Sequence, residues 1–362
     1  MTKRTLLFLS FLLISTSAQA IDFGWLTNSK SDKPVAPADS AKLLTLEPDE
    51  NEQSPKVAPD GKHLIVIASK DSQSWISRRA IENGDPVNTI TEDADAVNSA
   101  NWEAGGQVTF LSDRAGGLGL WQKAADGKGV LRRAVELNGS IAEPTLLADG
   151  STVAVRLIPD GNKQVQKRNQ RENFDNWTHP GFEAHIVRIL SNGSEQALSR
   201  GVNPAISPDG SWVAFSVASG RSYHLFLMKI DGSELTQLTD SRSVDVQPAW
   251  SADGQWIVFT SNRAEPDLRS PSKSNWDIWA ISRDGRTLNR LTKDSGRDGA
   301  PSVSKNGTVY FHSDRDVSKL DALDHQVKGN TRGFHIWSVK LFAEQATDSP
   351  KTAPKETTSP AK

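Results

Sequence analysis

The feature that most constrains the fold is a repeat in which a turn-forming glycine returns about every 44 to 60 residues. An apolar residue stands four positions before each of these glycines, and a proline stands six positions before five of them. The glycines are Gly61, Gly106, Gly150, Gly210, Gly254 and Gly307. A repeat architecture buries the apolar face of each unit against its neighbours. The sequence therefore predicts one domain built from six similar units.

Each unit has the pattern of four short β-strands. An apolar segment such as Trp212 to Phe215 follows the glycine turn, and β-branched and aromatic residues of this kind pack well on a pleated sheet. A further strand and a second glycine turn come next, and the unit ends in Leu-Thr or a similar pair, as at Leu238 and Thr239. Four short strands joined by tight turns form the blade of a β-propeller. We therefore predict an all-β, six-bladed β-propeller of four-stranded blades.

The sixth unit stops after its third strand, near Lys340, and lacks a closing Leu-Thr pair. The missing pattern stands ahead of the first unit, at Leu43, Leu44 and Thr45. An N-terminal strand that completed the last blade would pair strand edges that are otherwise exposed. We expect this strand to close the ring.

The N-terminus resembles a cleavable secretory signal. Lys3 and Arg4 precede an apolar run of about nine residues, and small residues follow up to Ala20. The run is shorter than the ~20 residues that a membrane span needs. We expect cleavage after Ala20, export to the periplasm of a double-membraned bacterium, and no transmembrane segment in the mature chain.

The predicted organisation has four parts. They are a signal peptide (1–20), an N-terminal segment and linker (21–42), the propeller (43–341) and a disordered tail rich in Pro, Thr and Lys (342–362). The mature start, Ile21 to Trp25, is apolar for a free end; it is either a docking segment or a segment that packs on the propeller.

Composition excludes several classes of function. The chain has no cysteine, which excludes disulfides, zinc–thiolate sites and thiol nucleophiles. Lys and Arg total 42 against 44 Asp and Glu, so the formal net charge is -2. This balance argues against a general electrostatic grip on nucleic acid or anionic lipid. We expect a monomer.

Two stretches resemble a known repeat. Pro204 to Gly210 reads PAISPDG and Pro248 to Gly254 reads PAWSADG, and both are similar to the Pro-Asp propeller repeat of TolB-type proteins. The resemblance implies a six-bladed periplasmic propeller that binds other envelope proteins, in that family the lipoprotein Pal and TolA. Unlike TolB, this chain leaves only about 22 residues between the predicted cleavage site and the first strand, too few for the α/β domain that precedes the TolB propeller. Oligogalacturonate lyases and propellers attached to peptidases share the repeat.

Insertions between the second and third strands lengthen units three, five and six. They are expected to crowd one rim of the ring, and long loops on a rigid scaffold commonly carry binding residues. The alternative is that these residues pack the loops onto the rim. The candidates for a partner-binding rim are Trp177, His179, Trp276, His325 and Arg332.

Acidic residues recur shortly before the repeat proline, at Glu52, Asp245 and Asp298. Carboxylates at the channel mouth would hold a cation there, although water or backbone groups are the alternative partners. Ser-Asp-Arg or Ser-Asn-Arg triplets end at Arg114, Arg263 and Arg315. We expect the Asp or Asn to form a turn and each arginine to pair with a neighbouring blade; the alternative is that the arginines ring the channel mouth with positive charge.

Catalytic patterns are sparse. The sequence has no G-x-S-x-G and no H-E-x-x-H motif. We predict a non-enzymatic scaffold that binds another cell-envelope protein or lipoprotein and needs no cofactor. The alternative is a metal-dependent, glycan-active propeller similar to oligogalacturonate lyase, with His179, His185 and His325 as candidate ligands.

Overall fold

The computed structural model describes residues 40–71, 73–91, 98–161, 174–270, 274–326 and 330–342. The chain divides into residues 1–32 and residues 33–362, and every described residue belongs to the second unit. The predicted signal peptide, the mature start and the tail beyond Phe342 lie outside the described residues. No helix in the described part is long and apolar enough to cross a membrane.

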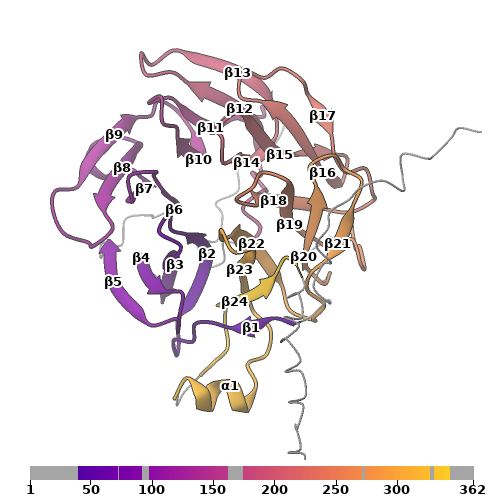
Figure 1. Cartoon of the computed structure of the whole chain (residues 1–362). Helices are drawn as coiled ribbons and strands as arrows, with labels where there is room; N and C mark the ends of the chain where they lie inside the picture. The colour runs from indigo at the N-terminus through magenta and orange to yellow at the C-terminus, as the bar shows by residue number, and fades with distance from the viewer. Residues whose placement is uncertain are drawn as a thin grey trace, which may run out of the picture. The chain divides into compact units, whose positions relative to one another are not determined.

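Six four-stranded antiparallel sheets surround a common centre (Figure 1). Blade one holds β2 (Asn51–Val57), β3 (His63–Lys70), β4 (Gln73–Ala80) and β5 (Pro86–Thr91). Blade two holds β6 (Asn98–Trp102), β7 (Gln107–Ser112), β8 (Gly119–Ala124) and β9 (Arg132–Glu136). Blade three holds β10 (Ile141–Leu146), β11 (Thr152–Pro159), β12 (Phe182–Ile189) and β13 (Glu195–Arg200). Blade four holds β14 (Val202–Ile206), β15 (Trp212–Ser219), β16 (Ser222–Lys229) and β17 (Thr236–Gln237).

Blade five holds β18 (Asp245–Trp250), β19 (Trp256–Ser261), β20 (Asp277–Ser282) and β21 (Leu288–Arg290). Blade six holds β22 (Asp298–Val303), β23 (Thr308–Ser313), β24 (His335–Lys340) and β1 (Lys42–Leu43). A short 3₁₀ helix, η2 (Arg114–Gly116), and one α-helix, α1 (Lys319–Asp324), lie in loops of blades two and six. The all-β, six-bladed fold predicted from the repeat is confirmed.

The first turn of four of the six blades is an Asp-Gly turn, whose side-chain chemistry shapes the strand connection. In blade four, the Asp209 side chain accepts hydrogen bonds from the Ser211 N–H (3.1 Å) and the Ser207 hydroxyl. Gly210 then takes a left-handed conformation at φ +73°. A short acidic side chain followed by glycine is suited to such a turn. The repeated glycines therefore mark strand connections.

Each inner strand carries a β-bulge next to the repeat proline. The residue before the proline, or before Ala100 in blade two, has φ between 48° and 58°, and the strand register shifts there. This conformation costs a non-glycine residue on the order of 1 kcal/mol, so its recurrence indicates that the surrounding contacts impose it. The six bulge residues are Ser54, Ser99, Glu143, Asn203, Gln247 and Ala300.

Adjacent blades share apolar layers and backbone hydrogen bonds. Ile65 of blade one packs in one buried cluster with Phe110 of blade two. The Trp102 indole N–H donates to the Lys56 carbonyl at 2.8 Å, and the Trp250 indole donates to Ala205 at 2.9 Å. These two repeat tryptophans therefore join one blade to the blade before it.

The N-terminal strand β1 pairs antiparallel with β24 of blade six, with Leu43 opposite Trp337. The Leu44 and Thr45 N–H groups both donate to the Ile336 carbonyl, at 2.8 and 3.2 Å. The Thr45 hydroxyl accepts a hydrogen bond from the Ile336 N–H at 3.1 Å. Closure of the ring by this short strand stays a prediction.

Blade five shows why the Leu-Thr pattern recurs. Leu291 and Thr292 donate their N–H groups to the Ile278 carbonyl, at 2.8 and 3.3 Å. The Thr292 hydroxyl accepts a hydrogen bond from the Ile278 N–H at 2.9 Å. The threonine thus ends the outer strand by holding both polar groups of one residue on the third strand, the arrangement also made by Thr45.

Deleting residues 21–46 should lower the free energy of unfolding by several kcal/mol. It removes β1 and leaves the edge of β24 unpaired, and each buried hydrogen bond lost costs about 1 kcal/mol. Urea unfolding measures the effect, with a deletion of residues 343–362 as the control. Equal midpoints for the N-terminally truncated and full-length proteins would contradict the closure account.

Candidate functional site

A segment from blade three crosses the inner strands of other blades. Between β11 and β12, Phe174 contacts the rings of Trp177 (centroids 5.6 Å apart), Trp276 of blade five (5.4 Å) and Phe334 of blade six (6.0 Å). Phe174 and both tryptophans are buried. We call Phe174, Asn176 and Trp177 the channel plug.

Polar groups hold the channel plug against the inner strands. The Gln247 side-chain amide donates to the Phe174 carbonyl and to the Asn176 side-chain oxygen, both at 3.0 Å. The Asn203 amide donates to the same Asn176 oxygen at 3.2 Å. A methyl group added at Gly299 would lie 2.8 Å from the Phe174 ring, so the plug approaches β22 closely. It therefore touches blades four, five and six.

The bulge residues form a hydrogen-bond relay around part of the ring. The Asn203 N–H donates to the Glu143 carboxylate (2.6 Å), the Gln247 N–H donates to the Asn203 side chain (3.2 Å), and the Ala300 N–H donates to the Gln247 side chain (2.8 Å). In each link, the side chain of one blade binds the bulge N–H of the next. The relay therefore sets the mutual position of blades three to six.

A histidine replaces the missing acceptor between blades six and one. Ala300 has no polar side chain, and the Ser54 N–H donates instead to His312 Nδ1 at 3.0 Å. Burial and the nearby positive charge of Arg297 lower the pKa of His312 to about 3. The ring is therefore neutral at physiological pH, with its proton on Nε2.

The three predicted channel-mouth acids are fully buried and paired with arginines. Glu52 pairs with Arg79 at 2.6 Å, and Asp298 pairs with Arg315 at 2.6 Å. The third pair, Asp245 and Arg263, is joined at 2.5 Å. Burial raises the pKa of Glu52 to about 7, against the opposing effect of Arg79.

These arginines belong to the same blades as their partners. Arg263 and Arg315 follow β19 and β23, whereas Asp245 and Asp298 begin β18 and β22. The expectation that they pair with a neighbouring blade is therefore wrong for these two residues. The reason is that each guanidinium also lies over two aromatic rings of its own blade, which keeps the arginine side chain within that blade. Arg263 stands 5.2 and 5.3 Å from the Phe259 and Trp279 ring centroids, and Arg315 stands 5.5 and 5.0 Å from those of Phe311 and Trp337.

Two adjoining pockets lie side by side at one end of blade six. They have volumes of about 540 and 350 Å³, and they share Arg297, Asp314, Arg315 and Asp316. We call them together the blade-six groove. Its other lining residues are Asn51, Ser274, Asn275, Ser295, Gly296, Val317, Thr331, Arg332, Gly333 and Phe334.

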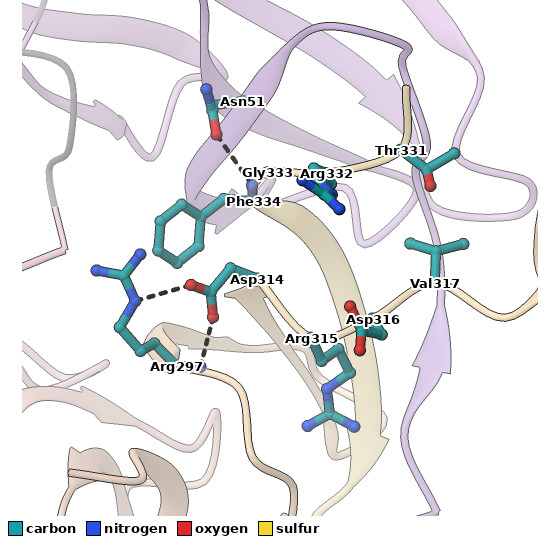
Figure 2. Close-up of a pocket in the computed structure, with 10 residues that line it drawn as sticks. All are labelled: Asn51, Arg297, Asp314, Arg315, Asp316, Val317, Thr331, Arg332, Gly333 and Phe334. Carbon is teal, nitrogen blue, oxygen red and sulfur yellow. Dashed lines mark hydrogen bonds and ion pairs between the residues drawn. The ribbon is translucent and has the colours of Figure 1, made fainter. Parts of the chain in front are cut away.

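The floor of the blade-six groove is fixed by ion pairs and close backbone contacts. Asp314 binds both the N–H (2.6 Å) and the side-chain Nε (2.8 Å) of Arg297, as Figure 2 shows. The Arg297 guanidinium lies 4.8 Å from the Phe334 ring centroid. Asn51 of blade one accepts a hydrogen bond from the Phe334 N–H at 3.0 Å. Blades one, five and six thus contribute to one polar surface.

Two charged side chains on the walls of the groove are exposed. The side chains of Arg332 and Asp316 make no hydrogen bond or ion pair with the residues that the structure describes, and both line the larger pocket. The Asn330 side chain accepts a hydrogen bond from the Arg332 backbone N–H at 3.1 Å. One positively charged and one negatively charged side chain, Arg332 and Asp316, therefore remain available in the groove among the described residues.

The predicted rim residues fall in different places. Trp177 and Trp276 lie side by side, with ring centroids 5.1 Å apart, and both are buried in one apolar cluster with Phe174. Arg332 lines the groove, and His325 caps the C-terminal end of α1. The His179 carbonyl accepts the Phe182 N–H at 3.0 Å, in the turn before β12. A binding role for these five residues stays a prediction.

The candidate cation sites are also dispersed. In the part of the chain that the structure describes, no group of three or more His, Asp or Glu side chains is arranged to hold a metal ion. His185 of β12 lies 3.4 Å from Glu183 on the same strand. Glu52, Asp245 and Asp298 each face an arginine instead of a shared cavity.

Sequence reasoning did not identify Asn51, Arg297 and Asp316 as site residues. Arg297 directly precedes the repeat acid Asp298, and Asp316 directly follows the Ser-Asp-Arg triplet. The repeat acid and the Ser-Asp-Arg triplet of the sixth unit could therefore have placed Arg297 and Asp316 at one end of blade six. Asn51 carried no such signal, because its role depends on the approach of blade one to blade six.

Together, the fold and the repeat define a six-bladed β-propeller with TolB-type repeats. Residues 185–267 match a family model described as the TolB beta propeller domain. This stretch includes all of blade four and the quoted repeats, and the resemblance to TolB-type propellers is confirmed there. A comparison with curated proteins found no match.

Solved structures share the architecture at low identity. TolB from Acinetobacter baumannii is 15% identical, with 83% of this chain and 66% of that chain covered and a TM-score of 0.48. A gluconolactonase from Xanthomonas campestris is 14% identical, with 86% and 96% covered and a TM-score of 0.53. An oligogalacturonate lyase in complex with manganese is 12% identical, with 85% and 96% covered and a TM-score of 0.51. The similarities to the gluconolactonase and to the lyase show the fold alone.

Glu52→Gln should flatten the dependence of stability on pH. The pKa of Glu52 in the folded protein, about 7, lies above the ordinary value of 4.5. Its stabilising contribution is therefore complete below about pH 4.5 and is lost as pH rises through about 7, by an amount on the order of 3 kcal/mol. Urea unfolding at acidic and alkaline pH measures this, with the exposed Glu82→Gln as control. Parallel pH profiles for wild type and Glu52→Gln would refute it.

Phe174→Ala should destabilise the protein by about 3 kcal/mol, because it removes a buried ring that contacts three blades. Leu323→Ala is the matched control: Leu323 is 72% exposed on α1, and its truncation should change stability by less than ~0.5 kcal/mol. Chemical denaturation measures both variants. Similar losses for the two would show that the plug does not hold the blades together.

Proposed function

We propose that this chain is a TolB-like binding propeller of the bacterial envelope, and that it docks a segment of another envelope protein in the blade-six groove. The observation that carries the proposal is the groove itself. It combines a rigid polar floor with one unpaired cation, Arg332, and one unpaired anion, Asp316, among the described residues.

The floor of the groove is already held in place, which favours a partner that fits the existing surface. Arg315 is buried against Asp298, and Arg297 is bound to Asp314. A Cβ at Gly333 would lie 2.8 Å from the Asn51 side chain, so the loop that carries Arg332 is packed closely on blade one. A surface that is already ordered spends little free energy on ordering when a partner binds.

The chemistry of the lining suits a polypeptide. Amide, hydroxyl and guanidinium groups surround the space, whereas the aromatic Phe334 is buried beneath it. An exposed aromatic face, which sugar stacking would use, is therefore not supplied by Phe334. Backbone amides and charged side chains of a peptide match the hydrogen-bonding groups of the groove.

The periplasmic setting rests on separate support. The pattern of residues 1–20 is that of a secretory signal. Residues 185–267 match the TolB propeller family model, and the resemblance to TolB is the reason for expecting envelope partners. The partner in our proposal is therefore an envelope protein or lipoprotein.

Charge reversal in the groove tests the proposal. Arg332→Glu and Asp316→Arg should each reduce recovery of the envelope partner in affinity purification by about tenfold, which corresponds to the ~1.4 kcal/mol of one lost charged contact. Thermal stability should not change, because both side chains are exposed. Quantitative mass spectrometry of the captured proteins provides the measurement.

Lys128→Glu and Glu82→Arg are the matched controls. Both residues are exposed in turns at the other ends of the strands and should leave recovery unchanged. Equal recovery with the groove variants and wild type would overturn the groove as the docking site. A divalent metal retained in stoichiometric amount and lost in His179→Ala or His325→Ala, together with glycan-cleaving activity, would favour the enzymatic alternative.

A further inference from the structure

Arg297 joins the channel plug to the blade-six groove. Its guanidinium carbon lies 5.4 Å from the ring centroid of Phe174, which belongs to the plug, and 4.8 Å from that of Phe334, which belongs to the groove. The two rings are nearly parallel, at 15°, and their centroids are 6.0 Å apart. Both rings are buried, and a cation above an aromatic ring is held more strongly where water is excluded. One arginine therefore contacts an aromatic ring of each feature.

Asp314 fixes Arg297 on blade six. The Asp314 carboxylate accepts hydrogen bonds from the Arg297 backbone N–H at 2.6 Å and from its Nε at 2.8 Å (Figure 2). Hydrogen bonds between charged groups are strong, and two of them to one carboxylate restrict its orientation. A shift of the Arg297 guanidinium would therefore also move Asp314.

Both exposed charges of the groove stand near a contact of Arg297. Asp316 follows Asp314 by two residues, and Arg332 precedes Phe334 by two residues. A residue two positions from a fixed side chain can move only as far as two peptide units allow. The placement of both charges therefore depends on Arg297.

The channel plug reaches Arg297 from a different blade. Phe174 lies between β11 and β12 of blade three, and the Gln247 amide of blade five holds its carbonyl at 3.0 Å. The Phe174 ring also contacts the ring of Trp276, with centroids 5.4 Å apart, and the Trp276 carbonyl accepts the Asp298 N–H at 2.9 Å. A plug that left the channel would remove the aromatic contacts on both sides of the start of β22.

We infer that the channel plug orders the blade-six groove through Arg297, which acts as a positioning residue for Asp316 and Arg332. The inference rests on the function proposed for the groove and adds a means of regulation, because a partner would dock most strongly while the plug is seated. Coupling between two sites is reciprocal, so docking in the groove should in turn hold the plug in the channel.

Hydrogen exchange of the full-length protein tests the inference without a partner. Phe174→Leu removes the ring but keeps an apolar side chain, so the variant should stay folded. Peptides covering residues 295–299 and 331–336, which contain the Arg297 and Phe334 N–H groups, should exchange about tenfold faster, because local opening sets the exchange rate of ordered amides. The peptide covering β7 of blade two should be unchanged. Wild-type exchange in both groove peptides of Phe174→Leu would overturn the inference.

Phe110→Leu is the matched control. Phe110 is a fully buried ring of blade two, and the Arg114 guanidinium carbon lies 5.2 Å from its centroid. Its replacement should lower the stability of the protein about as much as Phe174→Leu does, yet leave the two groove peptides unchanged. Faster exchange of the groove peptides in both variants would show a general loss of stability and contradict a specific role of the plug.

Arg297→Met tests the route of the coupling. It should speed exchange of residues 331–336 by about the same factor as Phe174→Leu, and combining the two substitutions should cause no further change. Two residues that act through one contact are not additive. Additive effects on the groove peptides would contradict the route through Arg297.

Recovery of the envelope partner separates this inference from the proposed function. Phe174→Leu should reduce recovery, as Arg332→Glu does. Unchanged recovery with Arg332→Glu and Asp316→Arg would refute docking in the groove, whereas the exchange rates would still decide whether the plug orders it. Normal recovery with Phe174→Leu, when Arg332→Glu lowers recovery and the groove peptides of Phe174→Leu exchange faster, would overturn the regulation alone.

Discussion

The left-handed bulge residue of each inner strand is the constraint on which the centre of the molecule depends. Its conformation turns the backbone N–H out of the strand ladder and towards the preceding blade, where a side chain can accept it. Glu143, Asn203 and Gln247 supply that acceptor in succession. Blade six has alanine at this position, and His312 takes over the role by binding the Ser54 N–H. The same amides of Asn203 and Gln247 hold the channel plug.

The blade-six groove depends on a second set of interactions, the ion pairs of its floor. Each charged group of its floor is paired, because a buried charge without a partner would cost several kcal/mol. Asp298 is matched by Arg315, and Asp314 is matched by Arg297. Among the charged residues that line the groove, Arg332 and Asp316 are exposed and make no side-chain hydrogen bond or ion pair within the described part of the chain. The proposed docking site is therefore the part of the groove whose charged side chains are available to a partner.

Much of the fold follows from local signals in the sequence. The repeated Asp-Gly turn needs only a carboxylate and a glycine within a few residues, and the Leu-Thr pair ends a strand by bonds to one neighbouring residue, as Thr292 does with Ile278. Such features recur at a fixed spacing, so six units with four strands each could be predicted. The proline of five units marked the inner strand, although not the bulge beside it.

The rest depends on contacts between residues far apart in the chain. The channel plug is held through the Gln247 amide, which lies 73 residues from Phe174, and no spacing rule relates the two. Trp177 and Trp276 both lie in insertions, yet their burial against each other depends on the approach of blade three to blade five. The groove likewise joins Asn51 to Phe334, residues from the first and last blades.

Site-specific photocrosslinking from the groove tests the central claim most directly. A photoreactive amino acid at Thr331, which lines the larger pocket, should capture one envelope protein in living cells. The same probe at Val130, which is 89% exposed on blade two, should not capture it. Capture of the same protein from both positions, or of none from Thr331, would contradict the account of the blade-six groove as a docking site.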